Sequence, residues 1–270
     1  MWSVVNSCFK LLHKFKIIKL NTLFTGRNLI HVARLSSTND WAMQLLFSSR
    51  PVEGTLIWAD YQTHGRGQRG NTWEAAKGEN LTFSLIFYPT FLRPTQLFRL
   101  CKMISVAICE YLQELLPGQK VHIKWPNDIL VNRKKVAGIL IENQLGVNRV
   151  NASVIGIGLN VNQAEFPEEL GGKSCALCFF TQQEWDRQTV LEGLLQRIES
   201  LYLALRHDKI GGINRTYLQN LYAYQEKVPI RIGDTWEEFT IVGVNEMGQL
   251  AVEEDGKLRY FNVREAHIFY

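Results

Sequence analysis

The segment from Gly65 to Gly70 reads Gly-Arg-Gly-Gln-Arg-Gly, which places three glycines and two arginines in six positions. Glycine lets the backbone approach a ligand closely and adopt positive φ angles. Arginine supplies a fixed positive charge and a planar set of donors that suits carboxylates and phosphates. This composition is typical of a loop that closes over an anion, so it favours folds that can present such a loop beside a binding site.

Two common phosphate-binding motifs share features with this segment, but neither fits it. The glycines satisfy the dinucleotide pattern G-x-G-x-x-G, and a plausible strand at 55–59 precedes them. Residues 71–78, however, lack the apolar periodicity of a helix, and a tight strand-to-helix turn has little use for two arginines. A P-loop needs its phosphate-binding lysine where this chain has Asn71. For the segment taken alone, a solvated basic turn remains the alternative.

The composition indicates a globular, soluble protein. The chain has 270 residues, of which 46% are hydrophobic and 21% charged, enough for one large domain or for a large and a small one. The five cysteines are scattered and odd in number, which argues against a disulfide framework. Cys175 and Cys178 form one C-x-x-C pair without two further ligands at a matching spacing. We therefore expect structural thiols and no dedicated metal site.

The net charge of +4 comes from the start of the chain. Six of the 30 basic residues lie in the first 39 positions, which hold no acidic residue, so the remainder has 24 basic against 26 acidic residues. A body with a charge near −2 carries no broad nucleic-acid footprint. The sequence therefore predicts that this protein does not bind DNA.

The first 25 residues differ from the rest, because they mix Leu, Ile and Phe with Lys and could form a basic amphipathic helix. They fit a mitochondrial transit peptide loosely, and they are interrupted by lysines too often for a secretory signal. No apolar run is long enough to span a membrane. We favour a poorly packed extension, or a start placed upstream in the reading frame. A cytoplasmic location is the default expectation, with a mitochondrial one as the alternative if 1–25 is a transit peptide.

The body alternates between strand and helix patterns. The expected strands are 28–32, 55–59, 81–88, 121–124, 129–131, 136–142 and 150–156, and the expected helices are 41–46, 94–116, 184–205 and 214–221. After Tyr224 the texture changes to short strands at 228–232, 239–244, 250–252 and 258–261. This second part is too small to hold much core of its own, so we expect it to pack on the first.

Four further segments combine polar or charged residues with glycine or an aromatic residue. They are Ser37-Thr38-Asn39, Lys124-Trp125-Pro126-Asn127-Asp128, the stretch from Lys135 to Glu142, and Gly156-Ile157-Gly158-Leu159-Asn160. Each alone has an ordinary structural explanation: a helix cap, a turn, a solvated charge or a strand end.

In this order, and together with the segment at 65–70, they resemble the signature of biotin–protein ligases, also called biotin–[acetyl-CoA-carboxylase] ligases or holocarboxylase synthetases. The resemblance runs from about Gly26 to Tyr270. It implies an α+β fold of the class II synthetase-like, biotin–lipoate ligase type, with a mixed sheet flanked by helices and a small C-terminal SH3-like β-barrel. The implied divisions are an extension at 1–25, a biotin- and ATP-binding catalytic domain at 26–223 and the β domain at 224–270. Only about 25 residues precede the catalytic domain, so we expect a short form without an N-terminal DNA-binding domain.

The resemblance also implies a reaction with two steps. Biotin and MgATP give biotinyl-5′-AMP and pyrophosphate, and the biotinyl group then passes to one lysine of a biotin carboxyl carrier domain of a biotin-dependent carboxylase. Both the biotin carboxylate and the phosphates are anions, so the first step depends mostly on positioning and charge neutralisation. We expect a monomer or a homodimer.

The resemblance assigns roles to the residues that match the family's motifs. The implied catalytic residues are Arg66, Lys135 and Arg69. The implied biotin-binding residues are Ser37, Thr38, Asn39, Gln62, Gly65, Arg66, Gly67, Gln68, Lys135, Gly138 and Gly156. The implied ATP- and adenylate-binding residues are Arg66, Arg69, Trp73, Lys124, Asn127, Asp128, Lys135 and Asn160.

Within these sets, Trp73 is expected to stack on adenine, and Asp128 to assist the metal or the incoming amine. Gln68 stands where some relatives have a second arginine, which weakens one charge contact but keeps a donor. His64 stands where many relatives have a small residue, and we assign no catalytic role to it.

Two other functions stay open at this point. A lipoate or octanoate ligase or transferase shares the fold, although the segments at 65–70 and 124–128 favour biotin. A non-catalytic regulator that binds biotin or a nucleotide is the other alternative. The presence of both Arg66 and Lys135 argues against it, because a protein without catalysis has no need of both cations.

Overall fold

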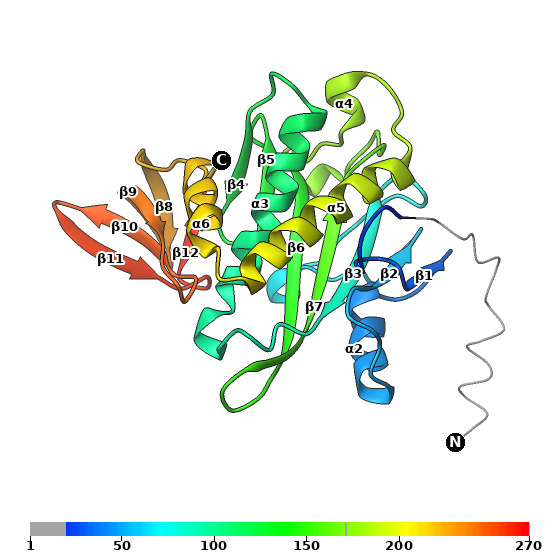
Figure 1. Ribbon diagram of the computed structural model, residues 1–270. Helices are drawn as coiled ribbons and strands as arrows, with labels where there is room; N and C mark the ends of the chain where they lie inside the picture. The colour runs from blue at the N-terminus through cyan, green and yellow to red at the C-terminus, as the bar shows by residue number, and fades with distance from the viewer. Residues whose placement is uncertain (1–19, 171, 270) are drawn as a thin grey trace.

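The computed structural model describes residues 20–170 and 172–269, apart from the side chains of Arg69 and Glu169 (Figure 1). Most of the segment expected to be an N-terminal extension, residues 1–19, lies outside this range. None of the helices in the described ranges is both long and apolar enough to cross a membrane.

A seven-stranded mixed sheet forms the centre of the molecule, in the order β1-β2-β3-β7-β6-β5-β4. Its strands are β1 (Leu29–Val32), β2 (Thr55–Ala59), β3 (Leu81–Phe87), β4 (Val121–Lys124), β5 (Asp128–Val131), β6 (Lys134–Leu145) and β7 (Val150–Leu159). The pair β1–β2 is parallel and the other pairs are antiparallel. The mixed sheet expected from the sequence is therefore confirmed.

Helices cover both faces of this sheet (Figure 1). On one face lie α3 (Phe98–Leu115), α5 (Arg187–Arg206) and α6 (Ile210–Gln219), and on the other lies α2 (Thr38–Ser48). Strand β3 shows how the two faces differ. Phe83 and Leu85 belong to the main core with α3 and α5, whereas Ser84 points to the start of α2. Successive side chains of a strand alternate between faces, so one strand serves both the core and the face that carries α2.

Short helical turns complete this part. They are α4 (Cys178–Thr181) and the 3₁₀ turns η1 (Gln68–Gly70), η2 (Pro94–Gln96) and η3 (Glu168–Leu170).

The observed helix boundaries differ from the expected ones for local reasons. Helix α2 starts at Thr38 rather than 41, because the Ser37 side chain accepts a hydrogen bond from Asp40 N and caps the helix there. Helix α5 starts at Arg187, where Asp186 caps it through Thr189 N. Helix α6 includes two glycines at its start, which the sequence pattern placed outside the helix.

The hairpin of β6 and β7 is longer than expected. Its register runs from Ala137 opposite Leu159 to Leu145 opposite Val150. Because the two strands pair along this whole length, each continues past its apolar stretch. The stabilisation from cross-strand pairing depends on the partner strand, so the hydrophobic pattern of a single strand does not predict where the strand ends.

The C-terminal part is a five-stranded antiparallel sheet in the order β11-β10-β9-β8-β12. Its strands are β8 (Lys227–Ile232), β9 (Thr235–Val244), β10 (Leu250–Glu254), β11 (Lys257–Phe261) and β12 (Ala266–Ile268). It packs on the central part as expected: Trp125 Nε1 donates to the carbonyl of Gly248 at 2.9 Å, and Lys102 Nζ donates to that of Val244 at 3.0 Å. Strand β12, which sequence patterns missed, has only three residues and forms by pairing with β8.

Residues 20–25 belong to the folded body, so packing begins earlier than the boundary placed after residue 25. The carboxylate of Glu199 in α5 accepts hydrogen bonds from the backbone N–H groups of Leu23, Phe24 and Thr25 at 2.6–2.8 Å. Only 6% of Glu199 is exposed. Burial raises the pKa of this carboxyl, but the bonds to the three backbone N–H groups outweigh burial and lower it below its usual value of 4.5.

We predict that Glu199→Gln lowers the free energy of unfolding by about 1.5–3 kcal/mol at pH 7, since an amide offers one acceptor oxygen and no charge. A lowered carboxyl pKa stabilises the fold above pH 4.5 and loses this effect as the pH falls through the folded-state value. Urea unfolding from pH 7 to pH 3 should therefore show a shallower acid-side decline for the variant. A decline as steep as that of the unchanged protein would contradict this assignment.

Candidate active site

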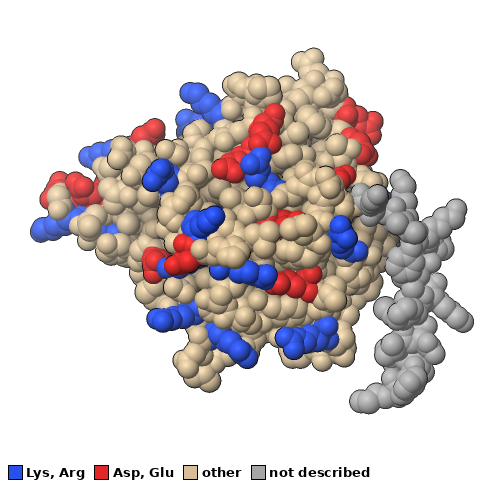
Figure 2. All heavy atoms as spheres, in the orientation of Figure 1, with Lys and Arg blue, Asp and Glu red and all other residues tan. Residues whose placement is uncertain are grey.

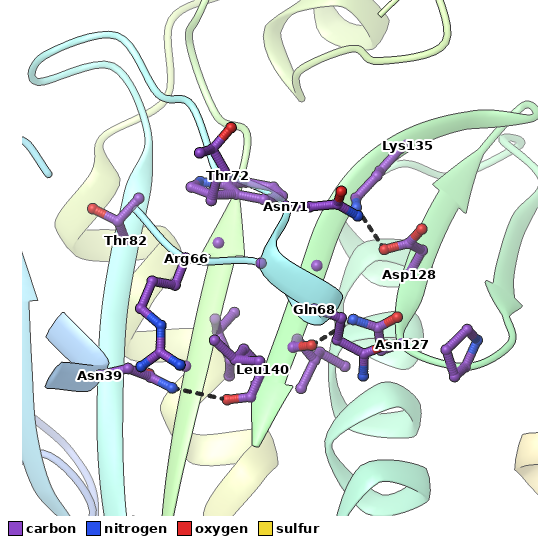
Figure 3. A pocket seen from close by; sticks show the side chains of 18 of the residues that line it. Asn39, Arg66, Gln68, Asn71, Thr72, Thr82, Asn127, Asp128, Lys135 and Leu140 are labelled. Atoms are coloured by element: carbon purple, nitrogen blue, oxygen red, sulfur yellow. Dashed lines mark hydrogen bonds and ion pairs between the residues drawn. The ribbon is translucent and has the colours of Figure 1, made fainter. Parts of the chain in front are cut away.

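A cavity opens where α2, the segment after β2, the turn between β4 and β5, and strands β6, β7 and β12 meet (Figure 3). It brings together most of the site residues expected from the sequence. Its lining includes Ser37, Thr38, Asn39, Gln62, Arg66, Gly67, Gln68, Trp73, Lys124, Asn127, Asp128, Lys135, Gly138 and Gly156. Gly65 and Asn160 are absent from the lining, and the side chain of Arg69 lies outside the part of the chain that is described.

One end of the cavity is a polar corner at the start of α2. Gln62 Oε1 accepts hydrogen bonds from Thr38 N at 2.7 Å and from Thr38 Oγ1 at 3.0 Å. Ser84 Oγ lies 2.7 Å from both Thr38 Oγ1 and Asn39 Oδ1. These bonds fix the two side-chain amides, and they leave Gln62 Nε2 as a donor that no other described residue uses.

A glycine makes room for this corner. A Cβ atom on Gly156 in β7 would lie 2.2 Å from Asn39 Oδ1, so any larger residue there would push the Asn39 amide away.

The floor of the cavity carries the indole of Trp73, which lies against two glycines. Gly138 and Gly158 are directly paired across β6 and β7. A Cβ atom on Gly158 would lie 2.2 Å from the indole, and one on Gly138 would lie 3.0 Å from it. No second ring fits between the indole and the sheet, so only the outer face of Trp73 is open to stacking. Lys135 Nζ lies 5.5 Å from the ring centre.

The segment at 65–73 forms a compact loop above this floor. Gly67 N donates to the carbonyl of Asn71 at 2.7 Å, and Trp73 N donates to that of Gly65 at 2.8 Å. A Cβ atom on Gly65 would lie 2.2 Å from the carbonyl oxygen of Trp73, so glycine is required for this approach. A 3₁₀ turn and not a helix follows the glycines, which agrees with the rejection of a dinucleotide fingerprint and of a P-loop.

Three cations line the cavity beside the loop. Lys135 Nζ forms an ion pair with Asp128 Oδ1 at 2.6 Å (Figure 3). Burial lowers the pKa of Lys124 to about 8; the nearby Asp128 opposes this effect, and Lys135 and Lys173 add to it. Burial alone would lower the pKa of Arg66, but hydrogen bonds to Asp40 and Glu142 outweigh it and raise the pKa. The cavity can therefore hold anions next to a flat hydrophobic surface.

Two of the expected residues have their amide groups turned toward the backbone. Asn127 Nδ2 donates to the carbonyl of Ile139 at 2.6 Å and so holds the turn between β4 and β5 against β6. Asn160 Nδ2 donates to the carbonyl of Cys175 at 3.1 Å, while Asn160 Oδ1 is buried without a partner among the described residues. Asn160 thus braces the chain around Cys175, which pairs with the backbone of Lys135.

Sequence patterns missed several residues of this site. Asp40 and Glu142 bind Arg66, Ser84 links the Thr38 hydroxyl to the Asn39 amide in the polar corner, and residues 266–268 of β12 line the cavity. Asp40 directly follows Asn39, and Glu142 ends the apolar stretch that begins at Lys135, so a signal was present for both. No local signal marks β12, because it reaches the cavity only through its pairing with β8.

The described residues contain no group of three or more His, Cys, Asp or Glu side chains that could hold a metal ion. Cys175 is buried, which raises the pKa of its thiol to about 12, as for a structural cysteine.

Residues 31–160 match the Biotin/lipoate A/B protein ligase family. Over 186 residues the chain is 39% identical to the bifunctional ligase/repressor BirA of Bacillus subtilis, a match that covers 68% of this chain and 56% of that protein. It is 29% identical to a biotin–[acetyl-CoA-carboxylase] ligase of Mycobacterium tuberculosis, over 67% of this chain and 66% of that one. The chain thus spans little more than half the length of the Bacillus protein.

Solved structures show the same fold. The biotin protein ligase of Aquifex aeolicus, in complex with biotin and ATP, superimposes with a TM-score of 0.76 at 28% identity. The match covers 90% of this chain and 99% of that one. With that coverage, the similarity extends well beyond residue 160.

We predict that Gly158→Ala lowers the free energy of unfolding by about 1–3 kcal/mol, because its methyl group would displace the Trp73 indole. The matched control is Gly211→Ala in α6, where a Cβ atom meets nothing within 4 Å. The same substitution there should raise stability by about 0.5–1 kcal/mol, since alanine favours a helix. Urea unfolding measures both variants. A change in the free energy of unfolding that has the same sign in both would contradict the prediction.

Proposed function

We propose that this chain, which belongs to the biotin/lipoate A/B protein ligase family, activates biotin with MgATP and transfers it to a lysine of a carrier protein. In the first step a biotin carboxylate oxygen attacks the α-phosphorus of ATP, and pyrophosphate leaves. In the second step the lysine Nζ attacks the acyl carbon, AMP leaves and the amine loses a proton. The observation that supports the proposal is the cavity itself. Its lining combines the polar corner, the three cations Arg66, Lys124 and Lys135, and the outer face of Trp73.

In this proposal the polar corner binds the ureido head of biotin. A buried ureido group needs partners for its carbonyl and its N–H groups, since burial without them is costly. Gln62 Nε2 donates to no other described residue, and Ser37 and Thr38, both buried at the start of α2, bring hydroxyl groups to the same cavity lining. Fixing these groups before the ligand binds lowers the entropy lost on binding.

The cations suit the first step, which brings two anions together. Arg66 and Lys135 are expected to neutralise the carboxylate and the α-phosphate, and buried Lys124 is expected to add charge on the nucleotide side. Each of the three is a member of the cavity lining. The open face of Trp73 would then take the adenine ring, because its other face is closed by the glycines of β6 and β7.

Magnesium enters this proposal with ATP as part of the substrate. The carboxylate in the lining, Asp128, already pairs with Lys135. The metal is therefore expected to be held mainly by the phosphates, without a dedicated set of protein ligands.

We also propose that the carrier is a biotin carboxyl carrier domain and that the protein acts in the cytoplasm. Binding of a carrier protein needs a site that is accessible from the surface, but it does not need the continuous basic surface that nucleic-acid binding uses. On the face drawn in Figure 2, basic and acidic side chains are interspersed, in keeping with the balanced charge of the main body.

The first test is transfer of biotin to a purified apo carrier domain with MgATP, read by mass spectrometry, with lipoate as a parallel substrate. We expect a mass increase on one carrier lysine with biotin and none with lipoate. Transfer of lipoate would identify the alternative ligase of the same fold. Absence of both transfer and pyrophosphate release, with biotin still bound, would identify a regulator without catalysis.

A second test concerns retention of the mixed anhydride, which hydrolyses easily in water. We predict that Arg66→Gly releases biotinyl-5′-AMP about 10- to 100-fold faster than the unchanged protein, through loss of charge-assisted hydrogen bonds. Bystander lysines should then become labelled. The matched control is Arg149→Gly near the tip of the β6–β7 hairpin, which should retain the intermediate normally. Equal retention by the Arg66 variant would contradict the assigned role of Arg66.

A further inference from the structure

Two carboxylates, Asp40 and Glu142, hold Arg66, and the sequence motifs gave neither of them a role. Its Nη1 donates to Asp40 Oδ1 at 2.5 Å and to Glu142 Oε2 at 3.1 Å, and its Nη2 donates to Glu142 Oε1 at 2.9 Å. The contact with Glu142 is bidentate and joins the 65–70 loop to β6, whereas the contact with Asp40 uses one nitrogen only. Bidentate pairs fix the plane of a guanidinium as well as its position.

The hydrogen-bond inventory of Arg66 shows what is left for a ligand. A guanidinium has five N–H donors. The edge formed by Nη1 and Nη2 is taken by Glu142, and the outer N–H of Nη1 by Asp40. The N–H of Nε and one N–H of Nη2 donate to no other described residue. These two form the second edge of the group, and one carboxylate or phosphate can accept both.

Glu142 also reaches the polar corner. Its Oε2 accepts a hydrogen bond from Asn39 Nδ2 at 2.9 Å, and Asn39 Oδ1 is within 2.7 Å of Ser84 Oγ. In Figure 3 the guanidinium of Arg66 lies beside the amide of Asn39. One carboxylate therefore fixes the orientation of an amide in the polar corner and of the arginine in the loop.

We propose that Glu142 is a positioning residue for this site: it grips Arg66 by one edge of the guanidinium, closes the loop over the cavity and leaves the other edge for the anionic group of the ligand. Asp40 is the carboxylate that the incoming anion displaces from Arg66. The two carboxylates place more negative charge than positive around Arg66, so an incoming anion is repelled unless one carboxylate gives way. The Asp40 side chain is 40% exposed and makes a single contact, whereas the Glu142 side chain is 25% exposed and makes a bidentate one. The contact with Asp40 therefore breaks more easily.

This inference rests on the proposed function for the identity of the anion, but its contacts exist without any ligand, so they can be tested separately. Trypsin cleaves after Arg66 and Arg69, and cleavage requires the loop to open. We expect Glu142→Gln to raise the rate of cleavage in the loop of the ligand-free protein about tenfold, because it removes a charged, bidentate partner. Asp40→Asn should raise it less than about threefold.

The same variants are then loaded with biotin and MgATP, and release of biotinyl-5′-AMP is followed. Glu142→Gln should speed release about tenfold, whereas Glu237→Gln, which alters an ion pair in the C-terminal sheet, should leave it unchanged. The decisive comparison is a double-mutant cycle with Arg66→Gly. If Glu142 acts through Arg66, Glu142→Gln adds no further release on that background.

The outcomes separate the two ideas. An unchanged protein that forms no biotinyl-5′-AMP overturns the proposed function, while the cleavage rates still test the grip on Arg66. Cleavage in the loop at the same rate for Glu142→Gln and Asp40→Asn overturns the inference. So does a Glu142→Gln effect on release that persists in full beside Arg66→Gly, since the residue would then act through Asn39 or the fold alone.

Discussion

The pairing of Gly138 with Gly158 across β6 and β7 is the constraint on which the site depends. Two residues without side chains, side by side on one face of a sheet, leave a flat area on which the Trp73 indole lies directly. Trp73 in turn closes the loop, because its backbone N–H donates to the carbonyl of Gly65. The position of the glycine- and arginine-containing loop, and hence of Arg66, therefore follows from two missing side chains in the sheet below it.

The site is polar and charged, yet its groups are held before any ligand arrives. Ser84, on the face of β3 opposite the main core, links Thr38 and Asn39, and Glu142 links Asn39 to Arg66. These partners come from α2, β3, β6 and the loop after β2, so the central sheet fixes the distances between them. Such preorganisation suits the proposed reaction between two anions, since reorganising charges during the reaction would add to its barrier.

The sequence predicted the mixed sheet, the long helices and most of the cavity lining, because these depend on local periodicity and on short motifs. It did not predict the partners that depend on tertiary contacts. Glu142 ends the motif that begins at Lys135, but only the structure shows Arg66 as its partner, and β12 becomes a strand only by pairing with β8. Asn160 shows what a motif leaves out: its amide donates to the carbonyl of Cys175 and braces the segment beside Lys135, while its contact with the nucleotide stays a prediction.

Calorimetric titration of the ligand-free protein with biotin and with lipoate shows whether the polar corner recognises a ureido group. Lipoate has the same carboxylate on an aliphatic chain but a dithiolane in place of the ureido ring, so it leaves the donors and acceptors of the corner unpaired. A site built on hydrogen bonds rejects an analogue that lacks them by about 10⁴-fold. We expect saturable binding of biotin, and an affinity for biotin higher than that for lipoate by about this factor. Equal affinity for the two acids, or binding of lipoate alone, would contradict it.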